Sequence, residues 1–191
     1  MKKMILTLIT GITISNQAFS SEMVVPDNWN YIELARVKID SERGSDLDGF
    51  GVDAKFSLND IFYLSGTFQD YSSDISEHER YLLGFGARYK INKQLSPYAQ
   101  IEHVTVDSTN RFINSSINYW MLGVGISGVA NDFGYKVAIT HYEEISGINK
   151  NYSGYYAEIY YAISKQFSMG VELEYVDDSS DLYNYAFRYH Y

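Results

Sequence analysis

Apolar and polar side chains alternate along most of the chain with a period of two residues. The alternation is clearest over residues 80–91, where one parity is apolar: Tyr81, Leu83, Phe85, Ala87, Tyr89 and Ile91. The other parity is mostly charged or small: Arg80, Leu82, Gly84, Gly86, Arg88 and Lys90. Successive side chains of a β-strand point to opposite faces of its sheet, so the pattern predicts strands with one apolar and one polar face.

Ten such runs follow one another, near residues 31–40, 47–58, 61–71, 80–91, 96–107, 119–129, 133–143, 154–164, 167–177 and 182–191. Short polar turns and longer polar stretches connect them in alternation, which favours an up-and-down order with turns at one end and loops at the other. Each run is close to the length of about 9–11 residues that a tilted transmembrane strand needs. We predict an all-β fold, a transmembrane antiparallel up-and-down β-barrel of ten strands, with eight strands as the alternative.

The orientation of the two faces decides between a soluble barrel and a membrane barrel. Tyrosine and tryptophan gather near the ends of the apolar runs, as at Tyr81, Tyr89 and Trp120, where membrane barrels carry their interfacial aromatic girdles. Seven of the 14 glycines lie on the polar parity, where they relieve crowding in a narrow lumen. These features favour a membrane barrel with its polar parity inward.

The first twenty residues have the layout of a Sec signal peptide. Lys2 and Lys3 precede an apolar stretch from Met4 to Ile14, and small residues follow at Ala18 and Ser20. We predict cleavage after Ser20, export from the cytoplasm, and a single barrel domain over residues 21–191.

Composition narrows the range of functions. The 15 Lys and Arg against 24 Asp and Glu give a net charge of −9, which argues against nucleic-acid binding. The sequence has no cysteine, which excludes disulfides, thiolate metal sites and catalytic thiols. We expect a monomer with no cofactor.

The last predicted strand carries aromatic side chains at alternate positions up to the final residue: Tyr185, Phe187, Tyr189 and Tyr191. Together with the strand pattern, this ending resembles the small outer-membrane β-barrel proteins of Gram-negative bacteria, the porin-like group that includes the OmpA transmembrane domain, in a ten-stranded, short-loop version. The resemblance implies a place in the outer membrane, in contact with its lipid and lipopolysaccharide. It also implies that the four aromatic residues form the signal read by the outer-membrane barrel assembly machinery, with tyrosine where phenylalanine is commoner.

With the polar parity inward, twelve charged side chains are expected in the lumen. The acids are Glu33, Asp53, Glu102, Glu158, Glu172 and Glu174, and the bases are Lys55, Arg80, Arg88, Lys90, Lys136 and Arg188. Charges in so narrow a space need partners or water. Two hypotheses follow: a structural ion-pair network that fills the barrel, or a narrow hydrated pore whose wall charges select solutes.

Acidic side chains also gather at the predicted loop end: Asp40, Glu42, Asp46, Asp48, Asp70, Asp74, Glu77, Glu79, Glu143, Glu144, Asp177, Asp178 and Asp181. Carboxylate oxygens suit Ca²⁺ and Mg²⁺, although no loop has the spacing of an EF-hand. Basic side chains near the same rim are candidates for contacts with lipopolysaccharide phosphates: Arg36, Lys38, Arg43 and Arg111.

His141 and Glu143 share one strand face and form the best candidate for a catalytic pair, because a carboxylate can orient a histidine as a general base. The sequence lacks zinc motifs, phosphate-binding glycine loops and the Gly-x-Ser-x-Gly elbow. We therefore expect a non-enzymatic outer-membrane barrel with a structural or cell-surface interaction role. A narrow porin-like channel with a mixed-charge lumen is the alternative, and an outer-membrane hydrolase is a remote one.

Overall fold

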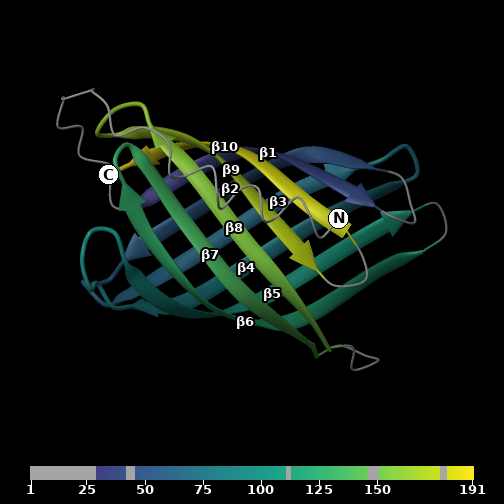
Figure 1. The fold of residues 1–191 in the computed structure, drawn as a ribbon. Coiled ribbons are helices and arrows are strands. Elements are labelled where there is room, and N and C mark those ends of the chain that lie inside the picture. Colours follow the sequence, from purple (N-terminus) through teal and green to yellow (C-terminus); the bar gives the residue numbers. More distant parts are fainter. Residues whose placement is uncertain (1–28, 42–45, 111–112, 146–150, 177–179) are drawn as a thin grey trace, which may run out of the picture.

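Ten strands wind around a single lumen in the computed structural model (Figure 1). The structure describes residues 29–41, 46–110, 113–145, 151–176 and 180–191, so the predicted signal peptide lies outside the described residues, as do Glu42, Arg43, Arg111, Asp177 and Asp178. The strands are β1 (Tyr31–Ser41), β2 (Leu47–Ser57), β3 (Phe62–Ser72), β4 (Ser76–Arg88), β5 (Ser96–Asn110), β6 (Asn114–Ala130), β7 (Phe133–Glu144), β8 (Asn151–Ala162), β9 (Phe167–Val176) and β10 (Ser180–His190).

Each strand pairs antiparallel with its neighbours in the sequence, and the first strand closes the sheet against the last. In that closing pair, Glu33 lies opposite Arg188 and Leu34 lies opposite Phe187. The prediction of a ten-stranded up-and-down barrel is therefore confirmed, and the eight-stranded alternative is wrong. Among the described residues, no helix is long and apolar enough to cross a membrane.

The outer face of the barrel is apolar and the inner face is polar. Leu83 is 73% exposed and Leu34 is 62% exposed, whereas Lys136 is fully buried and Arg188 is 2% exposed. A protein dissolved in water buries leucine and exposes lysine, so this arrangement suits a hydrocarbon solvent around the barrel. The predicted orientation of the two parities is confirmed.

Asparagine side chains explain why the short turns form where the sequence predicts them. Asn59 Oδ1 accepts hydrogen bonds from the backbone N–H groups of Ile61 and Phe62, both at 2.8 Å. Asn131 adopts a left-handed φ of 56° between β6 and β7, a conformation that asparagine tolerates better than most residues. These local bonds fix the end of the barrel that we call the turn end, and the opposite end is the loop end.

Four strands extend at least three residues further toward the loop end than the alternation predicts. β4 begins at Ser76 rather than residue 80, and β5 continues to Asn110 rather than residue 107. β6 begins at Asn114 rather than residue 119, and β8 begins at Asn151 rather than residue 154. Most of the added residues are polar, so the alternation of apolar and polar side chains is lost there, whereas the backbone ladder continues.

Glycine makes room for tyrosine rings inside the barrel. Tyr63 lies opposite Gly86 in the β3–β4 ladder, and Tyr160 lies opposite Gly134 in the β7–β8 ladder. In each pair the ring occupies the space that a Cβ on the glycine would need. These glycines therefore let two large side chains pack within a narrow lumen.

Candidate functional site in the barrel lumen

Arg188 is the centre of an ion-pair layer nearer the turn end of the lumen. Its guanidinium forms ion pairs with Glu33 of β1, Glu158 of β8 and Glu172 of β9, the last with Nη2 and Oε1 at 2.7 Å. Lys136 of β7 adds an Nζ–Oε2 distance of 3.2 Å to Glu158. We call these five side chains the Arg188 layer.

Neighbouring side chains complete the hydrogen bonding of this layer. The Tyr156 hydroxyl donates to Glu158 Oε2 at 2.7 Å, and Asn184 Nδ2 donates to Glu172 Oε2 at 2.9 Å. The Arg188 guanidinium carbon lies 4.3 Å from the centre of the Tyr31 ring. The side chains of the Arg188 layer come from five neighbouring strands and link them across the lumen. Removing one partner of such a buried ion pair costs about 3–5 kcal/mol, so these links stabilise the barrel.

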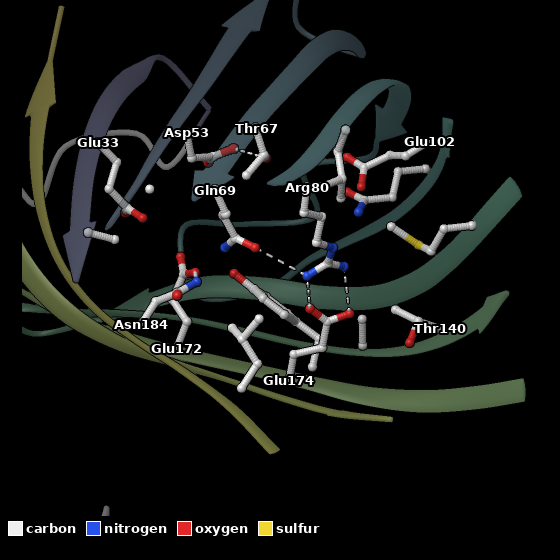
Figure 2. Close-up of a pocket in the computed structure, with 18 of the residues that line it drawn as sticks. Glu33, Asp53, Thr67, Gln69, Arg80, Glu102, Thr140, Glu172, Glu174 and Asn184 are labelled. Carbon is white, nitrogen blue, oxygen red and sulfur yellow. Dashed lines mark hydrogen bonds and ion pairs between the residues drawn. The ribbon is translucent and has the colours of Figure 1, made fainter. Parts of the chain in front are cut away.

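A second ion pair crosses the lumen nearer the loop end (Figure 2). Arg80 Nη1 lies 2.8 Å from Glu174 Oε2, and Nη2 lies 3.2 Å from Oε1. Arg80 also donates to Gln69 Oε1 at 3.4 Å and to the Tyr142 hydroxyl at 3.3 Å. β4 and β9 are five strands apart in either direction around the closed sheet, so the Arg80–Glu174 pair spans the lumen.

Trp29 occupies the lumen at the turn end, immediately before β1. It is 2% exposed, and its ring centre lies 4.5 Å from that of Tyr63 and 5.3 Å from that of Tyr98. Three cationic groups lie over the same ring: Lys136 Nζ at 5.1 Å, the Arg88 guanidinium carbon at 5.2 Å and Lys55 Nζ at 5.5 Å from its centre. Such contacts attract the cation to the ring face. Trp29 narrows this mouth of the lumen.

Apolar side chains line the lumen beyond Arg80, toward the loop end. One cluster joins β1, β3 and β10 through Val37, Ile39, Tyr71 and Leu182. A second cluster joins β5, β6 and β7 through Val104, Met121 and Tyr142, and it lies beside Arg80, to which the Tyr142 hydroxyl is bonded, rather than beyond it. The charged middle of the lumen therefore lies between an aromatic contact at the turn end and apolar walls at the loop end.

A cavity of about 90 Å³ lies in this charged middle, which gives room for several water molecules (Figure 2). Asp53 and Glu102 line it together with Glu33, Glu172, Glu174 and Arg80. Within the described part of the chain, the middle of the lumen carries six carboxylates: Glu33, Asp53, Glu102, Glu158, Glu172 and Glu174. It carries four basic side chains: Lys55, Arg80, Lys136 and Arg188. The middle of the lumen therefore has an excess of two acidic groups.

The other two predicted lumen bases lie elsewhere. Arg88 sits at the turn end, where it donates to the Ser57 hydroxyl at 3.4 Å and the Asp60 carbonyl at 3.3 Å. Lys90 lies beyond the end of β4 and is exposed, so it is not a lumen residue. The alternation in the sequence continues to Ile91, but the strand ends at Arg88 and the chain turns there. Trp29 was not predicted as a lumen residue because it precedes the first alternating run.

The candidate catalytic pair and the two loop-end bases of β1 lie outside the lumen. His141 is on the outer face and its Nδ1 lies 3.2 Å from Ser153 Oγ, while Glu143 is exposed on the same strand. The two bases of β1 form exposed ion pairs, Arg36 with Asp48 at 3.1 Å and Lys38 with Asp40 at 2.8 Å. In the described ranges, no three acidic or histidine side chains are grouped to hold a metal ion.

The aromatic residues of the last strand all point outward. Tyr185, Phe187, Tyr189 and Tyr191 are 41% to 55% exposed on the outer face. Three of them contact rings of other segments: Phe187 and Tyr189 both contact Phe167, and Tyr191 contacts Phe56. Their role as an assembly signal stays a prediction.

A closed antiparallel barrel with an apolar outer wall and an ionised lumen defines the class of outer-membrane β-barrel proteins. A family model described as Gram-negative porin matches residues 26–181, and the chain belongs to that family. The protein is accordingly a porin-like barrel of the outer membrane. A comparison with curated protein sequences finds no significant match.

Solved structures of other barrels superpose on this one. The NanC porin has a TM-score of 0.60 and 10% identity, covering 84% of this chain and 100% of that chain. The β domain of the Bordetella autotransporter BrkA has a TM-score of 0.50 and 10% identity, covering 84% of this chain and 98% of that chain. At these identities the likeness shows the fold alone.

Proposed function

We propose that the barrel is a narrow, non-enzymatic channel for small cations, kept closed at rest by the Arg80–Glu174 ion pair. The observation that carries the proposal is the position of this pair, which spans the lumen beside a cavity lined with carboxylates. Membership of the Gram-negative porin family supports conduction as the function of the lumen.

The charge of the lumen supports a preference for cations. Six carboxylates and four basic side chains lie in the middle of the lumen, among the described residues. A narrow channel wall with an excess of negative charge attracts cations. A ten-stranded barrel lies near the closed end of the size range, because eight strands leave an interior just filled by side chains. We therefore expect small currents and a low open probability.

The test is the conductance of the refolded barrel in a planar bilayer, after its heat-modifiable gel mobility has confirmed folding. Glu174→Gln removes the charge that holds Arg80 and should raise the open probability. Asp70→Asn removes a carboxylate from the outer face and serves as the matched control, with currents like those of the unaltered protein. If folded Glu174→Gln and the unaltered protein both stay silent, the proposal fails.

A structural role is the second candidate, and the Arg188 layer favours it. Ion pairs and hydrogen bonds link this layer to five strands, as expected of side chains that fill a barrel. If this role is correct, the folded protein carries no current in a planar bilayer. Deletion of loop residues then changes only its interactions at the cell surface.

We also propose that a cleaved Sec signal peptide, residues 1–20, exports the protein from the cytoplasm before it reaches the outer membrane. The basic start and apolar stretch of the sequence support this route. N-terminal sequencing of the protein from outer membranes should begin at Ser21, and an intact Met1 would exclude cleavage.

A further inference from the structure

The six carboxylates in the middle of the lumen are held in two different ways. Four of them form ion pairs with arginine: Glu33, Glu158, Glu172 and Glu174. The other two, Asp53 and Glu102, accept hydrogen bonds from hydroxyl groups. An arginine beside a carboxylate largely cancels its field, whereas a hydroxyl stabilises the carboxylate and leaves its charge in place. The two hydroxyl-held carboxylates therefore act more strongly on an ion in the lumen.

Asp53 is the more accessible of these two carboxylates. Its Oδ1 accepts a hydrogen bond from Thr67 Oγ1 at 2.7 Å (Figure 2), and its Oδ2 accepts one from the Tyr31 hydroxyl at 2.7 Å. Asp53 is half-buried on the cavity wall, whereas Glu102 is 4% exposed and is bonded to Ser65 Oγ at 2.6 Å. Because both oxygens of Asp53 are bonded, its carboxylate is fixed in position beside the cavity.

The basic side chains of the cavity do not form an ion pair with Asp53 among the described residues. Arg188 and Arg80 are each bonded to glutamate. Lys55 lies two residues along β2, and its ammonium is 5.5 Å from the centre of the Trp29 ring. This single lysine cannot balance both hydroxyl-held carboxylates, so the cavity wall around Asp53 has a net negative charge.

The same cavity has polar walls but no ring of oxygens that could replace the water around an ion. Thr140 Oγ1 and Asn184 Oδ1 are buried there without a partner in the protein, and buried oxygens of this kind are normally bonded to water. In the described parts of the chain, no three acidic or histidine side chains are grouped to hold a metal ion. An ion in this cavity therefore keeps its water and interacts with the wall through charge.

We propose that Asp53 determines the selectivity of the channel for cations over anions, and that the channel does not distinguish one alkali ion from another. A fixed carboxylate on a narrow wall raises the local concentration of cations and repels anions. Discrimination between K⁺ and Na⁺ depends on oxygens that replace the hydration shell, which the described cavity wall does not supply. The inference rests on the proposed function for conduction, and it adds the residue and the kind of selectivity.

The test is the reversal potential of the folded protein in a planar bilayer with a KCl gradient. Asp53→Asn keeps the shape of the side chain and should move the reversal potential toward zero while currents persist. The matched control is Glu33→Gln, which removes the same charge directly opposite Asp53 in the β1–β2 ladder, at a residue that is 1% exposed and paired with Arg188. It should shift the reversal potential less and lower the temperature at which the folded gel band is lost. Equal shifts in the two variants would assign selectivity to the total charge of the lumen and overturn the proposal.

A chemical version of the test varies the charge at one position with almost no change of shape. The sequence has no cysteine, so Asp53→Cys introduces the sole thiol. Alkylation in urea before refolding adds a carboxylate when the reagent is iodoacetate, and an amide of nearly the same size when it is iodoacetamide. The folded carboxylate form should prefer cations, and the folded amide form should lose this preference. The same reversal potential in both forms contradicts a role for the charge at residue 53.

The absence of alkali discrimination is measured with KCl on one side of the bilayer and NaCl on the other. The reversal potential should be close to the value that the mobilities of the two ions in water set, both in the unaltered protein and in Asp53→Asn. A strong preference for one alkali ion would indicate a coordination site and contradict the proposal. A folded barrel without currents overturns this inference together with the channel. Currents whose ion preference does not change in Asp53→Asn overturn the inference and leave the channel.

Discussion

Arg80 and Glu174 meet in the middle of the lumen from strands on opposite sides of the barrel, five positions apart in either direction. Their two hydrogen bonds, at 2.8 Å and 3.2 Å, join walls that share no backbone ladder. An ion pair placed this way can be exchanged without disturbing the sheet. It is therefore the contact in the lumen best suited to open and close.

Reversal of this pair should restore the closed state. Arg80→Glu and Glu174→Arg, made singly, each place like charges across the lumen, and each should raise the open probability of the channel. The double variant regains an ion pair and should return to small currents. Bilayer recordings of all four proteins form a double-mutant cycle. If the effect of the double variant on the open probability equals the sum of the two single effects, the two side chains are not directly coupled.

Trp29 should restrict the turn end of the lumen, and its environment can be measured separately from that of Trp120. In Trp120→Phe, the remaining tryptophan emission should resist quenching by brominated lipid, because Trp29 lies inside the barrel. In Trp29→Phe, brominated lipid should quench the emission of Trp120, which is 46% exposed on the outer face. Equal quenching in the two proteins would place Trp29 outside the lumen.

Trp29→Ala is then expected to increase the single-channel conductance, because it removes the ring that Tyr63 and Tyr98 contact. An unchanged conductance would assign the narrowest point of the channel to another residue.

Gly86→Ala should destabilise the barrel by about 1–3 kcal/mol, the usual cost of overpacking a filled interior. The added Cβ would occupy the position of the Tyr63 ring. Gly66→Ala is the matched control, because the nearest atom to its Cβ would be the Leu82 carbonyl oxygen at an ordinary 3.9 Å. Equilibrium unfolding in urea measures both, and similar losses would mean that strand propensity rather than ring packing sets the effect.

Arg188→Met should lower the free energy of unfolding by about 3–5 kcal/mol, because it leaves carboxylates of Glu33, Glu158 and Glu172 without their guanidinium. Arg36→Met removes an ion pair of similar geometry whose side chains are 73% and 55% exposed, and it should cost about 0–1 kcal/mol. Unfolding in urea compares the two. Equal costs would show that burial contributes little to the Arg188 layer.

The sequence predicts the fold because each membrane-spanning strand has one face toward lipid and the other toward the polar lumen. Leu83 and Phe85 face lipid, and Gly84 and Gly86 face the lumen. Large apolar residues therefore alternate with small or polar ones along the sequence, and this alternation assigns each residue to a face. The prediction loses accuracy where both faces meet water, as at the loop ends of β5 and β6. It also misplaces Lys90, since alternation continues past the residue at which the backbone leaves the ladder.

Parity assigns a side chain to the lumen, but it does not choose its partner. Arg80 pairs with a glutamate 94 residues away because strand tilt and closure bring those two heights together. Trp29 lies before any alternating run, and the residues that surround it come from distant strands. The partners within the lumen therefore depend on three-dimensional closure, which a local pattern does not contain.

Closure of the barrel also has a consequence for the order of assembly. Glu33 and Arg188 lie opposite each other in the β1–β10 ladder and are separated by 155 residues. Contacts between such distant parts of a chain form late, because the intervening loop must be closed first. Until the last strand docks, three glutamates of the interior have no arginine and remain in an unfinished sheet. The final strand therefore supplies, in one step, the edge that closes the barrel and the cation that pairs with three of its interior glutamates.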